Sequence, residues 1–314
     1  MIPSIIGVER LAILPLPYPF ELLFMQRALA AGVVVGAFAP LIGTFLVQKR
    51  MSLIGDGIGH LAFAGVALGA VTGIYPLWMA LVVSVAGALG VERLRARRQA
   101  SGDLALALFF YSGIALGIVL LSRELSPTNV LVYLFGQILT VSSGEVLVTV
   151  LLGALVAAVV LAVRRPLFAI VADEEWARVA GLPVAPLNNL LAVTTAVAVV
   201  ASMRVVGILL VAGLMVLPVA SARLLAGSFR GTMAWAMGIG VGSVVVGLVA
   251  SRFWGLASGG TIVLVAAATF AVVTALTGGQ SRRGVLRALR FRTRPSASPV
   301  SGEGSVILDH SHSD

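Results

Sequence analysis

The sequence predicts an all-α polytopic membrane protein, a bundle of eight to nine transmembrane helices with a partial or re-entrant helix near residues 130–141. Three observations predict this class. The chain of 314 residues is 59% apolar and only 11% charged, and its mean hydropathy is +1.05. A soluble domain of this size needs more charge on its surface. Several apolar stretches reach the roughly 20 residues that a helix needs to cross a hydrocarbon core of about 30 Å.

The apolar stretches predict one interfacial segment and a series of membrane spans. An interfacial segment is expected near residues 18–27, and spans are expected near residues 28–47, 53–73, 75–90, 104–122, 145–163, 187–203, 205–222, 232–250 and 260–277. The apolar part between residues 122 and 145 is too short to cross, so we expect a partial or re-entrant helix there.

This pattern divides the chain into three parts. Residues 1–27 form an N-terminal or interfacial segment, and residues 28–277 form the transmembrane domain. Residues 278–314 form a basic juxtamembrane segment followed by a polar tail, which is expected to be disordered. Inside the transmembrane domain, Pro40 and Pro218 are expected to kink their helices. Gly55, Gly59 and Gly65 belong to a series of glycines spaced by four, which lets helices pack closely in lipid.

The basic residues predict the orientation of the chain. If the spans alternate, one side receives 17 of the 22 basic residues, which are Lys49, Arg50, Arg93, Arg95, Arg97, Arg98, Arg164, Arg165, Arg178, Arg223, Arg230, Arg282, Arg283, Arg287, Arg290, Arg292 and Arg294. By the positive-inside rule this side is cytoplasmic, and so is the C-terminus. The net charge of +9 therefore reflects topology, and no nucleic-acid partner is expected.

Asp56 and His60 are the residues most suited to chemistry within a span. Asp56 is the only acid expected inside a span, and His60 is the only histidine outside the extreme C-terminus. At positions i and i+4 they share one helix face. A carboxylate and an imidazole suit Zn²⁺, Mn²⁺ and Fe²⁺, and a charge in a span usually lines a pathway. The alternative is a buried Asp–His pair that serves packing alone.

The loop of residues 168–186 is long for a connection between two spans. Asp173 can cap a short helix whose first turn is acidic, and Gly181 followed by Pro183 can end it. Such a helix could dock into a groove on a soluble partner or lie on the membrane surface, and the spacing alone favours neither. At the C-terminus, the His and Asp residues of 309–314 could bind a cation weakly, although a solvated terminus explains them better.

Several stretches together resemble a known family. The chain resembles the membrane permease of bacterial zinc/manganese/iron ABC importers, the ABC-3 family, over roughly residues 24–275. The resemblance rests on Phe24-Met-Gln-Arg-Ala-Leu-Ala-Ala-Gly32, Lys49-Arg-Met-Ser-Leu-Ile-Gly-Asp-Gly-Ile-Gly-His60 with Ala64-Gly-Val-Ala67, Tyr133-Leu-Phe-Gly-Gln-Ile-Leu-Thr140, Asp173-Glu-Glu-Trp-Ala-Arg-Val-Ala-Gly-Leu-Pro183 and Arg204-Val-Val-Gly-Ile-Leu-Leu-Val-Ala-Gly-Leu-Met-Val-Leu-Pro-Val-Ala220. These stretches occur in the same order as in the family.

The resemblance implies a homodimeric, multi-pass permease in the bacterial cell (inner or plasma) membrane. Its partners would be cytoplasmic ABC ATPase subunits, an extracytoplasmic metal-binding lipoprotein and the surrounding lipid. The transported ion would be Zn²⁺ or Mn²⁺, or else Fe²⁺, with no permanently bound cofactor. Asp56 and His60 would line the metal path. The ATPase-coupling residues would be Asp173, Glu174, Glu175, Trp176, Ala177, Arg178, Val179 and Gly181.

One loop departs from the family pattern. The last external loop usually resembles Asp-x-Pro-Ser-Gly, whereas this chain has Gly255-Leu-Ala-Ser-Gly259 and so lacks the acid and the proline.

Other functions are weighed against this one. An ion-coupled secondary metal transporter or channel usually places several ionisable groups in its spans, and this chain has one acid there. An intramembrane hydrolase is disfavoured because the sequence has no His-Glu-x-x-His motif, no second intramembrane acid and no cysteine. No catalytic residue is expected. The sequence also has no Gly-x4-Gly-Lys-Ser/Thr loop, so ATP hydrolysis would need a separate subunit.

Overall fold

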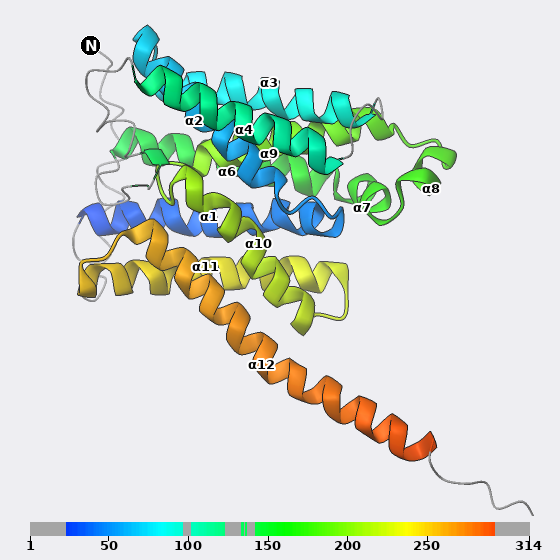
Figure 1. Cartoon of the computed structure of the whole chain (residues 1–314). Helices are drawn as coiled ribbons and strands as arrows, with labels where there is room; N and C mark the ends of the chain where they lie inside the picture. The colour runs from blue at the N-terminus through cyan, green and yellow to red at the C-terminus, as the bar shows by residue number, and fades with distance from the viewer. Residues whose placement is uncertain (1–22, 97–101, 123–132, 135, 137–141, 293–314) are drawn as a thin grey trace, which may run out of the picture. The chain divides into compact units, whose positions relative to one another are not determined.

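The structure is a computed structural model that describes residues 23–96, 102–122, 133–134, 136 and 142–292. Within these residues all regular structure is helical. The helices are α1 (Leu23–Gln48), α2 (Ile54–Thr72), α3 (Pro76–Ala96), α4 (Gly102–Leu121), α6 (Ser143–Ala162), α7 (Arg164–Ala172), α8 (Glu174–Val179), α9 (Val184–Ser202), α10 (Ile208–Leu225), α11 (Phe229–Trp254) and α12 (Ser258–Arg292). Figure 1 shows their arrangement.

The number of long apolar helices confirms the predicted fold class. Eight helices among the described residues are long and apolar enough to cross a membrane, and the apolar part of α10, Leu210–Leu225, is shorter. The partial helix expected near residues 130–141 lies largely outside the described residues. The helix α12 continues to Arg292 and so includes the start of the basic juxtamembrane segment, whereas the polar tail that was expected to be disordered lies outside the described residues. The contacts divide the chain into two units, Met1–Thr274 and Ala275–Asp314.

Glycines bring α2 into close contact with three neighbouring helices. A Cβ atom built on Gly65 would lie 2.6 Å from the Cα atom of Ala80 on α3. A Cβ atom on Gly59 would lie 3.2 Å from the Cγ2 atom of Ile208 on α10. On the α4 side, a Cβ atom on Gly113 would lie 2.9 Å from the carbonyl carbon of His60. Small residues at these points let the backbones approach, which is how helices gain van der Waals contact in lipid.

The remaining predicted packing residues also lie at helix contacts. Gly55 faces α10, where a Cβ atom would lie 3.2 Å from the Sδ atom of Met215. Pro40 lies inside α1 and Pro218 inside α10, as expected from the sequence. Beside Pro40, Gly36 meets α11, because a Cβ atom on Gly36 would lie 2.9 Å from the carbonyl oxygen of Gly240.

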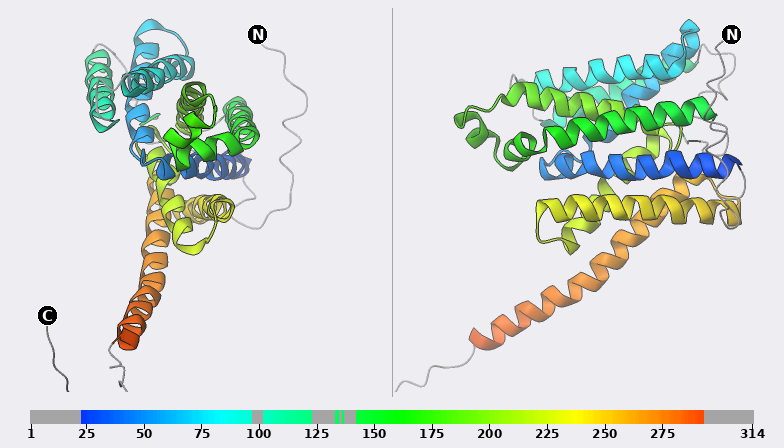
Figure 2. Two further views of the ribbon diagram at one scale, coloured as in Figure 1. Left: turned by 90° about the vertical axis from the view of Figure 1, so that its right-hand side faces the viewer. Right: turned by 180° about the vertical axis from the view of Figure 1, so that it is seen from behind.

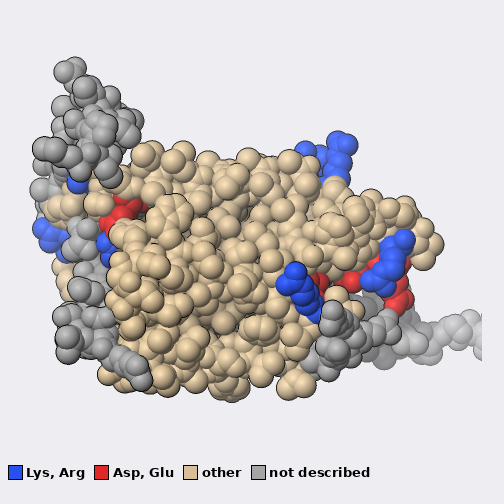
Figure 3. Space-filling model, turned by 90° about the horizontal axis from the view of Figure 1, so that it is seen from above, with Lys and Arg blue, Asp and Glu red and all other residues tan. Residues whose placement is uncertain are grey.

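Charged side chains gather at the two ends of the bundle. In the face shown in Figure 3, Lys, Arg, Asp and Glu lie at the two ends, and the wide band between them is uncharged. Figures 1 and 2 agree that α7 and α8 lie at the end where α1 and α3 finish and α11 begins. This end also carries Lys49, Arg95 and Arg230. The uncharged band is the part suited to a hydrocarbon environment.

The close contact at Gly65 yields a stability prediction. Gly65→Ala should destabilise the protein by about 1–3 kcal/mol, because the new Cβ atom would overlap backbone atoms of α3 that cannot move aside freely. Gly238→Ala is the matched control, since a Cβ atom there meets nothing within 4 Å. Thermal unfolding of purified protein in detergent measures both variants. Equal melting temperatures for the two would contradict the packing described here.

Candidate functional site

Asp56 and His60 lie on successive turns at the start of α2. Asp56 is in the first turn of the helix, where the partial positive charge of the helix N-terminus stabilises a carboxylate. The Oδ1 atom of Asp56 lies 3.8 Å from the Nε2 atom of His60. This distance allows an ion pair but exceeds that of a hydrogen bond. Asp56 and His60 therefore lie on the same face of α2, as predicted, and their side chains are close without a direct hydrogen bond.

The two side chains differ in their surroundings. Asp56 is 32% exposed, whereas His60 is only 11% exposed. The His60 ring packs edge-on against the ring of Phe110 on α4, with 4.3 Å between the ring centroids. The contact with Phe110 holds the imidazole in place, while the carboxylate remains accessible from outside the chain.

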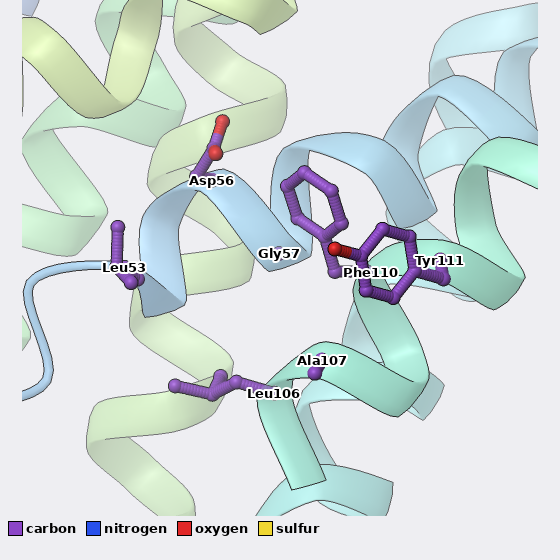
Figure 4. Close-up of a pocket in the computed structure, with 7 residues that line it drawn as sticks. All are labelled: Leu53, Asp56, Gly57, Leu106, Ala107, Phe110 and Tyr111. Carbon is purple, nitrogen blue, oxygen red and sulfur yellow. The ribbon is translucent and has the colours of Figure 1, made fainter. Parts of the chain in front are cut away.

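Asp56 lines a groove between α2 and α4. The groove has a volume of about 270 Å³, and its other lining residues are Leu53, Gly57, Leu106, Ala107, Phe110 and Tyr111. Figure 4 shows the Asp56 carboxylate on α2 together with the Phe110 and Tyr111 side chains of the neighbouring α4. The lack of a side chain at Gly57 leaves space beside the carboxylate. The groove is thus mainly apolar, with one anionic group that can meet a cation.

Within the described part of the chain, Asp56 and His60 do not form a complete metal-binding site. Among the residues described in Figure 1, no group of three or more His, Cys, Asp or Glu side chains lies close enough to hold a metal ion. A tight site for a transition metal usually takes four protein ligands, or three with one water. Two protein ligands can hold a cation only weakly unless water or another chain completes the shell.

The short helix predicted between two spans is α8. The Oδ1 atom of Asp173 accepts a hydrogen bond from the Trp176 amide at 2.9 Å and so caps the helix. Gly181 has a φ of +80°, a left-handed conformation that glycine adopts without strain, and it ends the turn. A salt bridge of 3.2 Å joins Arg178 to Glu174. Glu175 is exposed.

The apolar residues of α8 divide between two faces. Trp176 is 63% exposed and Val179 is 89% exposed, whereas Ala177 is fully buried. The methyl group of Ala177 packs inside this chain and does not itself reach the surface of α8, and the assignment of this segment to ATPase coupling stays a prediction. The exposed apolar surface of α8 consists of Trp176 and Val179, about one turn apart.

An arginine on α3 connects α8 to the bundle. The guanidinium of Arg95 lies 3.5 Å from the carboxylate of Glu92 on α3 and 3.7 Å from that of Glu174 on α8. Glu92 is 7% exposed. These ion pairs link two segments that are far apart in the sequence, a connection that spacing alone could not reveal.

A second polar contact at this end involves Lys49. Its Nζ atom donates a hydrogen bond of 2.6 Å to the Oδ1 atom of Asn188 on α9. The pKa of Lys49 is lowered from 10.5 to about 8, mainly by its partial burial and also by the nearby Arg95, although Glu92 and Glu174 act in the opposite direction. Sequence reasoning assigned Lys49 only to the positive-inside pattern and missed its partly buried position.

At the opposite end, an ion pair joins two other connecting segments. Arg204, which follows α9, pairs with Glu145 in the first turn of α6. The guanidinium of Arg204 also lies 4.8 Å from the centre of the Tyr133 ring. Glu145 further forms a capping box with Ser142. Arg204 is 59 positions from Glu145 in the sequence, so local spacing could not indicate this pair.

The fold and the distribution of charge define a multi-pass membrane protein. Its family follows from comparison with known proteins, because the ABC 3 transport family matches residues 21–277. The chain therefore belongs to the ABC 3 transport family. It is a membrane permease of the ABC transporter class, located in a cell membrane.

Individual relatives agree with this assignment. The chain is 32% identical to the manganese transport system membrane protein MntC of Listeria innocua, over 79% of this chain and 88% of that protein. It is 29% identical to a probable iron transport system membrane protein of Haemophilus influenzae, over 82% of this chain and 95% of that protein. Among solved structures, it is similar to PsaBC from Streptococcus pneumoniae in complex with Fab, with a TM-score of 0.73 and 31% identity over 80% of this chain and 91% of that chain.

The lowered pKa of Lys49 yields a pH prediction. Between about pH 8 and pH 10.5 the unfolded chain binds more protons at this residue than the folded chain does, so stability should rise with pH across this window. Lys49→Met keeps the apolar stem and removes the titrating group. We expect the melting temperature of the wild type to rise relative to that of Lys49→Met between pH 8 and pH 10. Parallel curves for the two proteins would contradict the lowered pKa of Lys49.

Proposed function

We propose that this chain is the transmembrane permease subunit of an ABC importer for a divalent transition metal ion, with the ion passing Asp56 and His60. The observation that carries the proposal is the carboxylate–imidazole pair beside an accessible groove in a chain of this family. Manganese is favoured by the name of the Listeria relative, and iron by that of the Haemophilus relative. Zinc fits the same two ligands.

A weak site suits transport better than a tight one. The Asp56 carboxylate would attract the hydrated cation, and the His60 imidazole would replace one of its waters. An ion held by only two protein groups can leave again, as conduction requires. A second copy of the chain, forming a homodimer across the exposed side of this groove, would add ligands or walls to the path. The exposed Tyr111, at 69%, belongs to this face of α4.

The energy would come from a separate cytoplasmic ATPase pair, and an extracytoplasmic metal-binding lipoprotein would deliver the ion. The exposed Trp176 and Val179 of α8 form the surface for ATPase contact. Movement of α8 would reach α3 through the ion pairs of Arg95 and then α2 through the close contact at Gly65. The positions of Asp56 and His60 would thus change with the nucleotide that is bound to the ATPase. In this arrangement the C-terminus is cytoplasmic, in agreement with the distribution of basic residues.

Removal of the charge at Asp56 tests the metal path. In cells that lack the native gene, Asp56→Asn should reduce accumulation of the transported metal to the level of cells without the protein, because an amide attracts a divalent cation far less than a carboxylate does. Asp56→Glu, which keeps the charge, should retain part of the uptake. Manganese, zinc and iron are measured by elemental analysis, together with the amount of protein in the membrane. Normal uptake by a well-expressed Asp56→Asn protein would show that the ion does not depend on the carboxylate of Asp56.

A charge on the exposed face of α8 tests the coupling surface. Val179→Glu should weaken binding of the ATPase subunit by about tenfold, since burying a valine at an interface is worth about 1.5 kcal/mol or more. Gln48→Glu introduces the same charge at an exposed position of α1 at the same end of the bundle and serves as the control. Co-purification and stimulated ATP hydrolysis provide the readouts. If both variants retain the ATPase equally, α8 is not the contact surface.

A further inference from the structure

A cavity of about 500 Å³ lies between α7 and the first two turns of α11, and the proposed transport path does not use it. Three arginines contribute to its lining: Arg164 and Arg165 from the start of α7, and Arg230 from the start of α11. The cavity is at the end of the bundle that carries α8, which is the cytoplasmic end in the proposed orientation.

Within the described part of the chain, no acidic side chain pairs with the arginines of this cavity. None of the lining residues is acidic, and in that part of the chain the three arginines take part in no salt bridge. Asp173, just beyond the far end of α7, is about 12 Å along the helix axis from Arg165, at 1.5 Å per residue, and farther from Arg164. That separation exceeds the screening length of about 8 Å at physiological salt. An anion from outside the chain would therefore find three guanidinium groups that have no salt-bridge partner among the described residues.

The rest of the cavity is apolar. The rings of Phe168 on α7 and Phe229 on α11 pack together, with 4.6 Å between their centroids. Met233 and Met237 extend this surface along α11 toward the middle of the span. Phe168 is 41% exposed, and Trp235, in the second turn of α11, is 53% exposed. An exposed tryptophan near the end of a span is typical of the membrane interface.

We propose that this cavity binds the headgroup of an anionic phospholipid of the cytoplasmic leaflet. Arginine suits phosphate because its planar fork can donate two hydrogen bonds to one oxyanion. Met237 is seven residues after Arg230, which corresponds to about 10 Å toward the membrane centre. A phosphate at the arginines would thus leave its acyl chains beside Phe168 and Met237. A free phosphate ion would use the arginines but gain nothing from the apolar surface.

Native mass spectrometry of delipidated, detergent-purified protein tests this binding. Phosphatidylglycerol, phosphatidylcholine and inorganic phosphate are titrated separately, and phosphate is also added in competition with phosphatidylglycerol. Near a membrane surface each arginine contributes about a fivefold gain in affinity for an anionic lipid. Each single change, Arg164→Gln, Arg165→Gln or Arg230→Gln, should therefore weaken phosphatidylglycerol binding about fivefold, and the triple variant about a hundredfold.

Two variants control for charge and folding. Arg93→Gln removes an exposed arginine from the same end of the bundle, away from the cavity, and should leave lipid binding unchanged. The triple replacement of the cavity arginines by lysine keeps the charge and should retain most of the binding.

Three results would overturn the proposal. They are equal binding of phosphatidylcholine and phosphatidylglycerol, displacement of the lipid by an equal concentration of inorganic phosphate, and loss of ATPase binding in a triple Gln variant that keeps its lipid. The last result would assign the arginines to the protein partner. Because metal uptake is not measured, failure here would leave the proposed transport function untouched.

Discussion

The arrangement of the site depends on the close packing of α2 against α3, α4 and α10. Apolar side chains gain little by leaving lipid for a protein interior, so helix association in a membrane relies on van der Waals contact and therefore on short distances. Gly59 and Gly65 on α2, and Gly113 on α4, provide these distances. They place α10, α3 and α4 around the first turns of α2. A larger side chain at any of these points would separate the helices that enclose Asp56 and His60.

The cost of charge in hydrocarbon explains how the remaining ionisable groups are arranged. Glu92 and Glu174 share Arg95, and Glu145 pairs with Arg204. These pairs lie at opposite ends of the bundle and join segments that are distant in the sequence. Asp56 differs from them, because its contacts are the helix N-terminus and a histidine 3.8 Å away. This limited compensation supports the proposal that Asp56 attracts an incoming cation. The three arginines beside α7, which form no salt bridge within the described residues, support the proposed anion site in the same way.

Features that depend on neighbouring residues were predictable. The spans follow from hydropathy, and the common face of Asp56 and His60 follows from helical periodicity. The cap of α8 by Asp173 follows from the preference of Asp for helix N-termini. Features that depend on distant residues were not. The hydrogen bond from Lys49 to Asn188 spans 139 positions, and the burial of Ala177 depends on how α8 lies against the bundle.

The sequence by itself determined that this protein is a helical membrane bundle, which acid and histidine within its spans share a helix face, and where the short helix between two spans begins and ends. These properties arise from composition and from interactions within a few turns of one helix. Only the tertiary structure decided that Asp56 faces a groove of α4, that Val179 rather than Ala177 is available on α8, and that Arg164 and Arg230 meet across a cavity. Each of these depends on which helices are neighbours and how they are rotated, and no local pattern in the chain specifies that.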